Sequence, residues 1–244
     1  MKKAIFNWSG GKDSSLCLHK VLEAGEYEVS TLLTTVSEKY QRISQHGVRV
    51  ALLEKQAASL GLRLHKAMVP EWPTMDSYNK LMGKTLRGFK EEDIDVSIFG
   101  DIFLEDLRKY REEKLSEEGF KGVFPLWKIP TNELAVEFIQ LGFKAIVVCI
   151  DEKHLDKSFA GREYNEAFLR DLPEEVDPCG EYGEFHSFVY DGPVFREAIS
   201  FEHGEVVYRK YEPKSKTEDE GDDYECGTTQ VAATGFWYCD LIPN

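Results

Sequence analysis

The sequence predicts an α/β fold in which a domain built on a parallel sheet is followed by a smaller α+β domain. Short apolar runs alternate with helical patterns as far as about residue 150, and a glycine-rich turn lies between the first run and the first helix. Such alternation is typical of parallel βαβ units. Beyond residue 150 the pattern becomes richer in turns and indicates antiparallel strands. We expect the two domains to comprise residues 1–130 and 131–244.

Each expected strand of the alternating part is a short apolar run, and most of its helices end at a glycine. The expected strands are residues 4–6, 29–36, 64–69, 96–99 and 145–150. The expected helices are a first one that ends before Gly25, a second over 48–60 before Gly61, a third over 104–118 before Gly119, and a fourth that Thr131 caps and that runs to Leu141.

The second half contains three features of its own. Two short apolar runs, 199–201 and 206–208, flank His203-Gly204, which predicts a hairpin. The acidic segment 212–225 is expected to be a solvated loop, with an interaction tail as the alternative. The apolar segment 236–239 is expected to pack back on the body of the protein.

Composition and charge disfavour several classes of protein. The formal charge of −14 lacks the basic footprint of nucleic-acid binders, so a nucleic-acid partner is unlikely. No window approaches the ~18 apolar residues that span a bilayer, and the first residues are too polar for a signal peptide. The five cysteines form no Cys-x-x-Cys pair, which favours reduced thiols. We therefore expect a cytoplasmic protein that does not enter membranes.

A polar, glycine-rich turn follows the first strand, with the sequence Ser9-Gly10-Gly11-Lys12-Asp13-Ser14-Ser15. Glycines let the backbone approach a ligand closely, and a helix N-terminus attracts phosphate. Lys12 adds a charge and the serines add hydroxyl donors. The motif matches neither the Walker A pattern nor Gly-x-Gly-x-x-Gly. It predicts a phosphate site, and the alternative is a turn that only caps the helix.

Two further loops could face the same ligand. Gly100-Asp101 follows an expected parallel strand, at the edge where open α/β sheets bind ligands. Asp101 could therefore contact the nucleotide or a metal ion, or it could cap the next helix. His46 follows the second strand and could face the nucleotide, or it could simply be exposed.

The densest polar cluster spans residues 177–188. It contains two carboxylates, Glu181 and Glu184, then His186 and Ser187. In extended backbone, Glu184 and His186 point to the same face and could form a proton shuttle. One alternative is a polar turn that leads into a strand. A metal site that includes Cys179 is the weaker alternative, because the spacing of these residues fits no standard site.

The phosphate turn resembles the Ser-Gly-Gly-Lys-Asp-Ser signature of the ATP pyrophosphatases, or PP-loop superfamily. Together with Glu-x-Gly-Glu-Phe-His-Ser and the following Phe-Val-Tyr-Asp-Gly-Pro, it resembles the diphthine–ammonia ligase family. The resemblance extends to about residue 195 and includes 99–102, 125–127 and 161–162. It implies a Rossmann-like, PP-loop ATP-binding domain with a C-terminal acceptor-binding domain.

The resemblance also implies a reaction, in which an acceptor carboxylate is adenylylated by ATP and then amidated by ammonia, with release of AMP and pyrophosphate. The acceptor is diphthine on elongation factor 2 or a related carboxylate, and Mg²⁺ is expected near Asp13. A non-catalytic ATP-binding module and a PP-loop tRNA-modifying enzyme are the alternatives.

Roles can be assigned to positions of this sequence on the same basis. The expected catalytic residues are Lys12, Asp13, Glu181, Glu184 and His186. The expected nucleotide-binding residues are Ser9, Gly10, Gly11, Lys12, Asp13, Ser14, Ser15, His46, Gly100 and Asp101. The expected acceptor-binding residues are Glu181, Glu184, His186 and Ser187.

Overall fold

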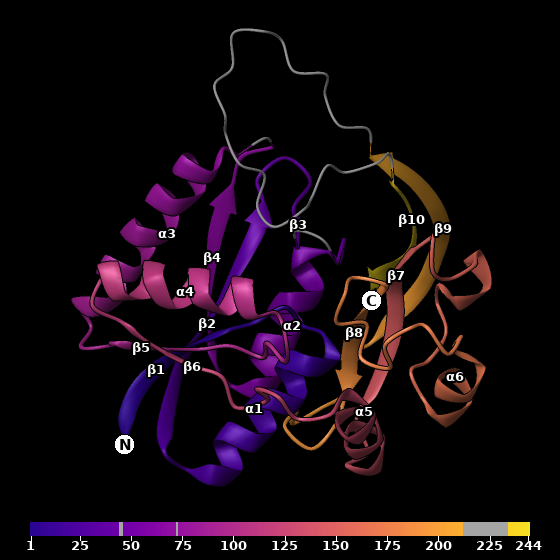
Figure 1. Cartoon of the computed structure of the whole chain (residues 1–244), viewed down its shortest axis with the longest axis horizontal. Helices are drawn as coiled ribbons and strands as arrows, with labels where there is room; N and C mark the ends of the chain where they lie inside the picture. The colour runs from indigo at the N-terminus through magenta and orange to yellow at the C-terminus, as the bar shows by residue number, and fades with distance from the viewer. Residues whose placement is uncertain (44–45, 72, 212–233) are drawn as a thin grey trace, which may run out of the picture.

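The computed structural model describes residues 1–43, 46–71, 73–211 and 234–244 and shows a mixed α/β fold with two sheets (Figure 1). The fold class expected from the sequence is confirmed. The acidic segment 212–225, expected to be a loop or tail, lies outside the described residues. Among the described residues, no helix combines the length and the apolar character that crossing a membrane requires.

The first sheet is parallel except for one short strand. β4 (Arg63–Val69) pairs with β2 (Tyr27–Ser37), β2 with β1 (Lys2–Asn7), β1 with β5 (Val96–Ile98), and β5 with β6 (Lys121–Val123). β3 (Arg42–Ile43) pairs antiparallel with the end of β2. The carboxyl ends of β1 and β5 are neighbours, so the loops that follow these strands meet.

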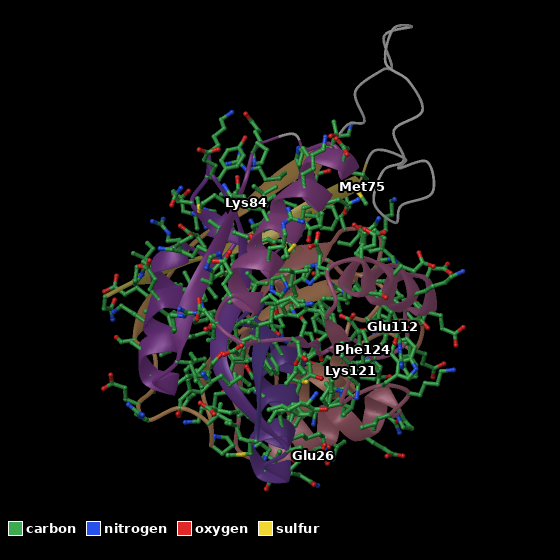
Figure 2. The ribbon with its side chains drawn as sticks, turned by 90° about the vertical axis from the view of Figure 1, so that its left-hand side faces the viewer. Glu26, Met75, Lys84, Glu112, Lys121 and Phe124 are labelled. Carbon is green, nitrogen blue, oxygen red and sulfur yellow. The ribbon has the colours of Figure 1, made fainter. Side chains whose placement is uncertain are left out.

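Helices cover both faces of this sheet. Because side chains alternate along a strand, Ala4 and Phe6 belong to the core cluster that contains residues of α1 (Lys12–Ala24) and α2 (Val50–Leu60). Ile5 packs in a second cluster with α3 (Met75–Lys90) and α4 (Glu105–Glu117). Figure 2 looks at the side that carries these last two helices, where Met75 and Lys84 mark α3 and Glu112 marks α4.

The second sheet is antiparallel, with the order β8-β7-β10-β9. Its strands are β7 (Lys144–Asp151), β8 (Phe185–Asp191), β9 (Phe201–Tyr211) and β10 (Thr234–Pro243). α5 (Thr131–Gln140), the 3₁₀ turn η1 (Lys157–Phe159) and α6 (Glu166–Asp171) belong to the same part of the chain. The larger core cluster includes Phe6 and Leu18 as well as Phe138 and Phe188, so the two parts of the chain share a core.

One strand was predicted in the wrong kind of sheet, and two elements were not predicted. The apolar run 145–150 is not a further parallel strand; as β7, it pairs antiparallel with β8 and β10. A fully buried central strand has the same apolar pattern in either kind of sheet. The additional parallel strand is β6, whose three residues give little signal. α3, with its N-cap Thr74, was not predicted.

The expected hairpin at His203-Gly204 is also absent, because β9 continues through both residues and pairs with β10. Gly204 lies beside the irregularity in β10, where an added Cβ would come within 3.2 Å of Asp240. Gly204 therefore permits a close approach of strands rather than a turn. Thr131 does not cap α5, since Pro130 occupies the N-cap and the Thr131 hydroxyl donates to Asp177. Residues 236–239 pack back on the body as part of β10.

Candidate active site

The phosphate turn connects β1 to α1 and leaves backbone donors available. Gly10 has φ +76°, and a Cβ there would lie 2.7 Å from the side-chain oxygen of Gln56. α1 begins at Lys12, with Gly11 as its N-cap. The amides of Asp13 and Ser14 form no hydrogen bond with a described residue. Free amides at a helix N-terminus, with its positive dipole end, form an anion site.

The serines of the turn stabilise its shape. The Ser9 and Ser14 hydroxyl oxygens lie 3.1 Å apart. Ser14 and Ser15 both donate to the carbonyl of Gly11, at 2.9 and 3.0 Å. Ser15 is completely buried, so in this structure its hydroxyl holds the turn.

Gln56 of α2, which belongs to no recognisable motif, holds the turn in place. Its amide nitrogen donates to the carbonyls of Gly10 (3.0 Å) and Val189 (2.6 Å). Its oxygen accepts from the indole of Trp8 at 2.9 Å. The available signal was a polar residue among the buried apolar positions of α2, next to Leu52, Leu53 and Ala57.

Lys12 joins the phosphate turn to residues 177–187, which we call the acceptor segment. Its buried ammonium donates to both carboxylate oxygens of Asp13, at 2.8 and 2.9 Å, and to the carbonyl of Cys179. The ring centroid of Phe185 lies 5.3 Å away. Burial alone would lower the pKa of Lys12, but the Asp13 charge raises it above its ordinary value. Lys12 is therefore a fixed cation between the two segments.

The start of β8 lies directly against the N-terminus of α1. Ser187 accepts a hydrogen bond from the amide of Lys12 at 3.1 Å through its hydroxyl oxygen. The amide of Val189 donates to the carbonyl of Gly10 at 2.9 Å. Ser187, predicted to bind the acceptor, thus accepts a hydrogen bond from the first amide of α1, and the two polar regions found in the sequence lie in direct contact.

The two glutamates of the acceptor segment are held differently. One oxygen of Glu181 accepts from the amides of Ile102 and Phe103, at 3.1 and 2.9 Å. Burial raises the pKa of Glu181 to about 7, and the Asp13 charge adds to this effect, against the two amides and Lys12. Glu181 can therefore accept or release a proton near neutral pH.

The carboxylate of Glu184 accepts backbone hydrogen bonds with both of its oxygens. One accepts from the amide of Asp177 at 3.1 Å and the other from Tyr182 at 2.9 Å, and the residue is buried. These bonds close the acceptor segment on itself. Glu184 thus holds the loop, and His186, its expected partner in a proton shuttle, stacks on another histidine.

His46 and His186 form a stacked pair beside the phosphate turn. Their ring centroids lie 4.5 Å apart, with 23° between the planes. Nδ1 of His46 is 3.4 Å from the carbonyl of Ser187, and an added Cβ on Gly11 would lie 3.1 Å from the His46 ring. Burial lowers the pKa of His46 to about 4 and that of His186 well below its ordinary value. Both rings are neutral at pH 7.

Gly100 and Asp101 lie next to the same helix terminus. A Cβ on Gly100 would be 3.2 Å from the carbonyl oxygen of Asp13, so a larger residue here would require the start of α1 to shift by a few tenths of an ångström. Asp101 pairs with Arg111 at 2.7 Å and does not cap α4, whose N-cap is Leu104. Burial raises the pKa of Asp101, although Arg111 opposes the effect.

Nearby carboxylates suit a hard cation that is completed by phosphate oxygens. The charge of Asp13 contributes to the raised pKa values of both Asp101 and Glu181, so Asp13 lies within electrostatic reach of both carboxyl groups. Among the described residues, no group of three or more His, Cys, Asp or Glu is arranged to hold a metal on its own. Mg²⁺ is usually bound by one or two carboxylates together with substrate phosphates, which fits Asp13.

This fold and its glycine-rich turn are those of an enzyme with a PP-loop type of nucleotide site. Comparison with known families gives a consistent result. Residues 1–122 match the diphthamide synthase N-terminal domain, and residues 130–215 match the diphthamide synthase C-terminal domain. The chain therefore belongs to the diphthamide synthase family, and it is a ligase of that kind.

Curated relatives agree with this assignment. The chain is similar to the diphthine–ammonia ligases of Homo sapiens (24% identity, 82% of each chain) and Danio rerio (27% identity, 82% of this chain and 86% of the relative). Among solved structures, it is similar to the U34-tRNA thiolase NcsA from Methanococcus maripaludis with its [4Fe-4S] cluster. That likeness has 20% identity and a TM-score of 0.34 and covers 58% of this chain and 57% of the other, too weak to support an inference.

Proposed function

We propose that the protein is an ATP-dependent amide ligase that adenylylates an acceptor carboxylate and transfers ammonia to it. AMP and pyrophosphate are the other products. The acceptor is diphthine, as the names of the curated relatives suggest, or a closely related carboxylate. The family resemblance implies that the diphthine is carried by elongation factor 2. The bridge formed by Lys12, between Asp13 of the phosphate turn and Cys179 of the acceptor segment, is the observation that carries the proposal.

In this proposal the phosphates of ATP bind at the N-terminus of α1. The amides of Asp13 and Ser14 would donate to phosphate oxygens, and Gly10 and Gly11 would let the phosphates approach the backbone. Asp13 would hold Mg²⁺, which neutralises charge on the phosphates when it is bound. Lys12 would stabilise the same charge from its fixed position.

The first step would form a bond between an acceptor carboxylate oxygen and the α-phosphorus. The bond from that phosphorus to the bridging oxygen of pyrophosphate would break, and pyrophosphate would leave with the bonding electrons. Backbone amides and Lys12, already in place before the reaction, would stabilise the charge that develops on the leaving group.

In the second step, the nitrogen of ammonia would attack the acyl carbon, and the bond from that carbon to the AMP oxygen would break. The attacking nitrogen must lose a proton to become the amide. We assign proton acceptance to Glu181, whose pKa of about 7 suits a base at neutral pH. Glu184 has both oxygens bonded to backbone amides, so we assign it to holding the acceptor segment.

The two neutral histidines would serve as hydrogen-bonding groups rather than as cations. A neutral imidazole has one donor and one acceptor nitrogen. His46 and His186 stand at the boundary between the phosphate turn and β8. We propose that the two imidazole rings contact the reacting groups. We also propose that residues 1–130 bind ATP and that residues 131–244 bind the acceptor.

The proposal is tested by product analysis with diphthine-bearing elongation factor 2, ATP, Mg²⁺ and ¹⁵N-labelled ammonium. The expected result is equal amounts of AMP, pyrophosphate and ¹⁵N-labelled acceptor, with loss of all three in Lys12→Met. Asp171→Asn, which breaks a surface ion pair with Arg162, is the matched control and should react as the wild type does. Binding of ATP without any AMP formation would contradict a ligase with this acceptor.

A further inference from the structure

Asp240 of β10 holds two arginines from the region around His46. One carboxylate oxygen accepts from Arg42 at 2.9 Å and from Nε of Arg49 at 3.1 Å; the other accepts from Nη2 of Arg49 at 2.5 Å. Arg49 thus forms the two-pronged contact that fixes carboxylate geometry. Burial alone would raise the pKa of Asp240, but the arginines lower it, so the carboxylate stays charged.

The two arginines belong to what we call the His46 arm, which comprises residues 42, 43 and 46–49. Arg42 donates to the carbonyl of Gly47 at 2.6 Å, and the amide of Gly47 donates to the carbonyl of Ile43 at 3.1 Å. Gly47 has φ +69°, and a Cβ on it would lie 2.9 Å from the ring of Tyr238 in β10. Hydrogen bonds within the arm therefore hold its shape, and the arm contacts β10 at Tyr238 and Asp240.

The opposite side of the arm contacts the active site. The His46 ring lies close to Gly11, the N-cap of α1, and stacks on His186. A continuous set of contacts thus runs from Asp240 through the arginines and Gly47 to the phosphate turn. The matched family domains end at residue 215, so Asp240 lies outside both of them.

We propose that Asp240 is a positioning residue of the nucleotide site, which sets His46 against the phosphate turn by holding Arg42 and Arg49 on β10. The inference rests on the proposed function, since it assumes that ATP binds at this turn. Asp240 acts through the arm and does not itself touch the reacting groups. By the same reasoning, β10 contributes to the site although its sequence carries no nucleotide-binding motif.

Asp240→Asn tests the inference, because it keeps the size of the side chain and removes its charge. The expected result is about a tenfold increase in the Kd for ATP measured by calorimetry, a matching increase in KM for ATP and a much smaller change in kcat. The His46 ring resonances, assigned by comparison with His46→Gln, should shift in the NMR spectrum. Asp240→Glu, which retains the charge, should restore most of the affinity.

Asp171→Asn is the matched control, because it breaks a second Asp–Arg pair, 2.7 Å long, that does not contact the arm. It should leave both the Kd for ATP and the His46 resonances unchanged. Arg49→Lys, which keeps the charge but loses the two-pronged contact, should weaken ATP binding in the same direction as Asp240→Asn. It provides a second test if Asp240→Asn fails to fold.

Two results would overturn the inference alone: wild-type affinity for ATP in folded Asp240→Asn, or an equal loss in Asp171→Asn. Failure of the wild-type protein to bind ATP would instead overturn the proposed function, and the inference with it. The calorimetric measurement on the wild type therefore separates the two failures.

Discussion

The imidazole rings of His46 and His186 stack on each other with their centroids 4.5 Å apart, although 140 residues separate them in the sequence. One ring comes from the His46 arm of the first part of the chain, and the other from β8 of the second sheet. Desolvation and the nearby Lys12 ammonium lower the pKa of both half-buried rings, so neither is charged at neutral pH. A proton on either ring would add a positive charge beside Lys12, so the stacked pair is favoured in its neutral form.

The first prediction follows from the pKa of His46, which is lowered from 6.5 to about 4. Between these values the unfolded chain binds a proton that the folded chain does not. The free energy of unfolding should therefore fall as pH falls from about 6.5 to 4, by at most about 3.4 kcal/mol for this group. Urea unfolding at pH 7 and pH 5 should show a smaller decrease in His46→Gln and in His186→Gln. An unchanged pH dependence in both variants would contradict the prediction.

A second prediction concerns the pH dependence of the reaction. If Glu181 accepts the proton, kcat should rise with pH through an apparent pKa of about 7 as its carboxylate ionises. Glu181→Gln should lose that dependence and lower kcat by roughly 10²–10⁴-fold. Glu184→Gln is the comparison: it places an amide group against a backbone donor, so stability should fall by about 1–3 kcal/mol. If kcat of Glu181→Gln still falls as the pH drops through about 7, another group must be the proton acceptor.

Gly100→Ala should impair nucleotide binding. The added Cβ would lie 3.2 Å from the carbonyl oxygen of Asp13 and 3.3 Å from the amide of Ser14, so the start of α1 would have to shift. We expect a stability loss of about 1–3 kcal/mol and at least a tenfold increase in the Kd for ATP. Calorimetry and denaturant unfolding measure the two effects.

Gly88→Ala is the control for this substitution. Gly88 lies in α3 with nothing within 4 Å of an added Cβ. Its replacement by alanine should stabilise the helix by about 0.5–1 kcal/mol and leave ATP binding unchanged. Equal effects of the two alanine substitutions on ATP binding would argue against close packing at Gly100 as the cause.

Gln56→Leu should destabilise the protein and loosen the phosphate turn. It removes three hydrogen bonds and leaves the Trp8 indole and the Val189 carbonyl unpaired in the interior. We expect a loss of about 3 kcal/mol. Gln140→Leu, an exposed position at the end of α5, should change stability by less than about 0.5 kcal/mol. Denaturant unfolding of both variants checks the prediction, which a near-neutral Gln56→Leu would contradict.

Local patterns were sufficient to predict the features that depend on residues close together in the sequence. The phosphate turn could be located because glycines, a lysine and serines fall together between a strand and a helix. The parallel sheet followed from alternation, and the ends of α1 and α2 followed from Gly25 and Gly61, both in the left-handed conformation.

Features that depend on long-range pairing could not be predicted in this way. An apolar run such as β7 does not show which strands will flank it, and Gly204 indicated a turn where it instead permits close strand packing. Gln56 and Asp240 carry no motif, because their roles depend on partners from distant parts of the chain. Nor could sequence spacing show that both carboxylate oxygens of Glu184 would accept hydrogen bonds from backbone amides.

The strand order of the second sheet has a consequence for how the chain is made. β10 comes after β7, β8 and β9 in the sequence, yet it lies between β7 and β9. While the protein emerges from the ribosome, β9 can gain its native partner only after β10 has been synthesised. Until then β7 presents an open, apolar edge of the kind that promotes association between chains. The His46 arm is synthesised early, but it can reach its native position only after β10 has been synthesised. We therefore expect nucleotide binding to be among the last properties that the nascent protein acquires.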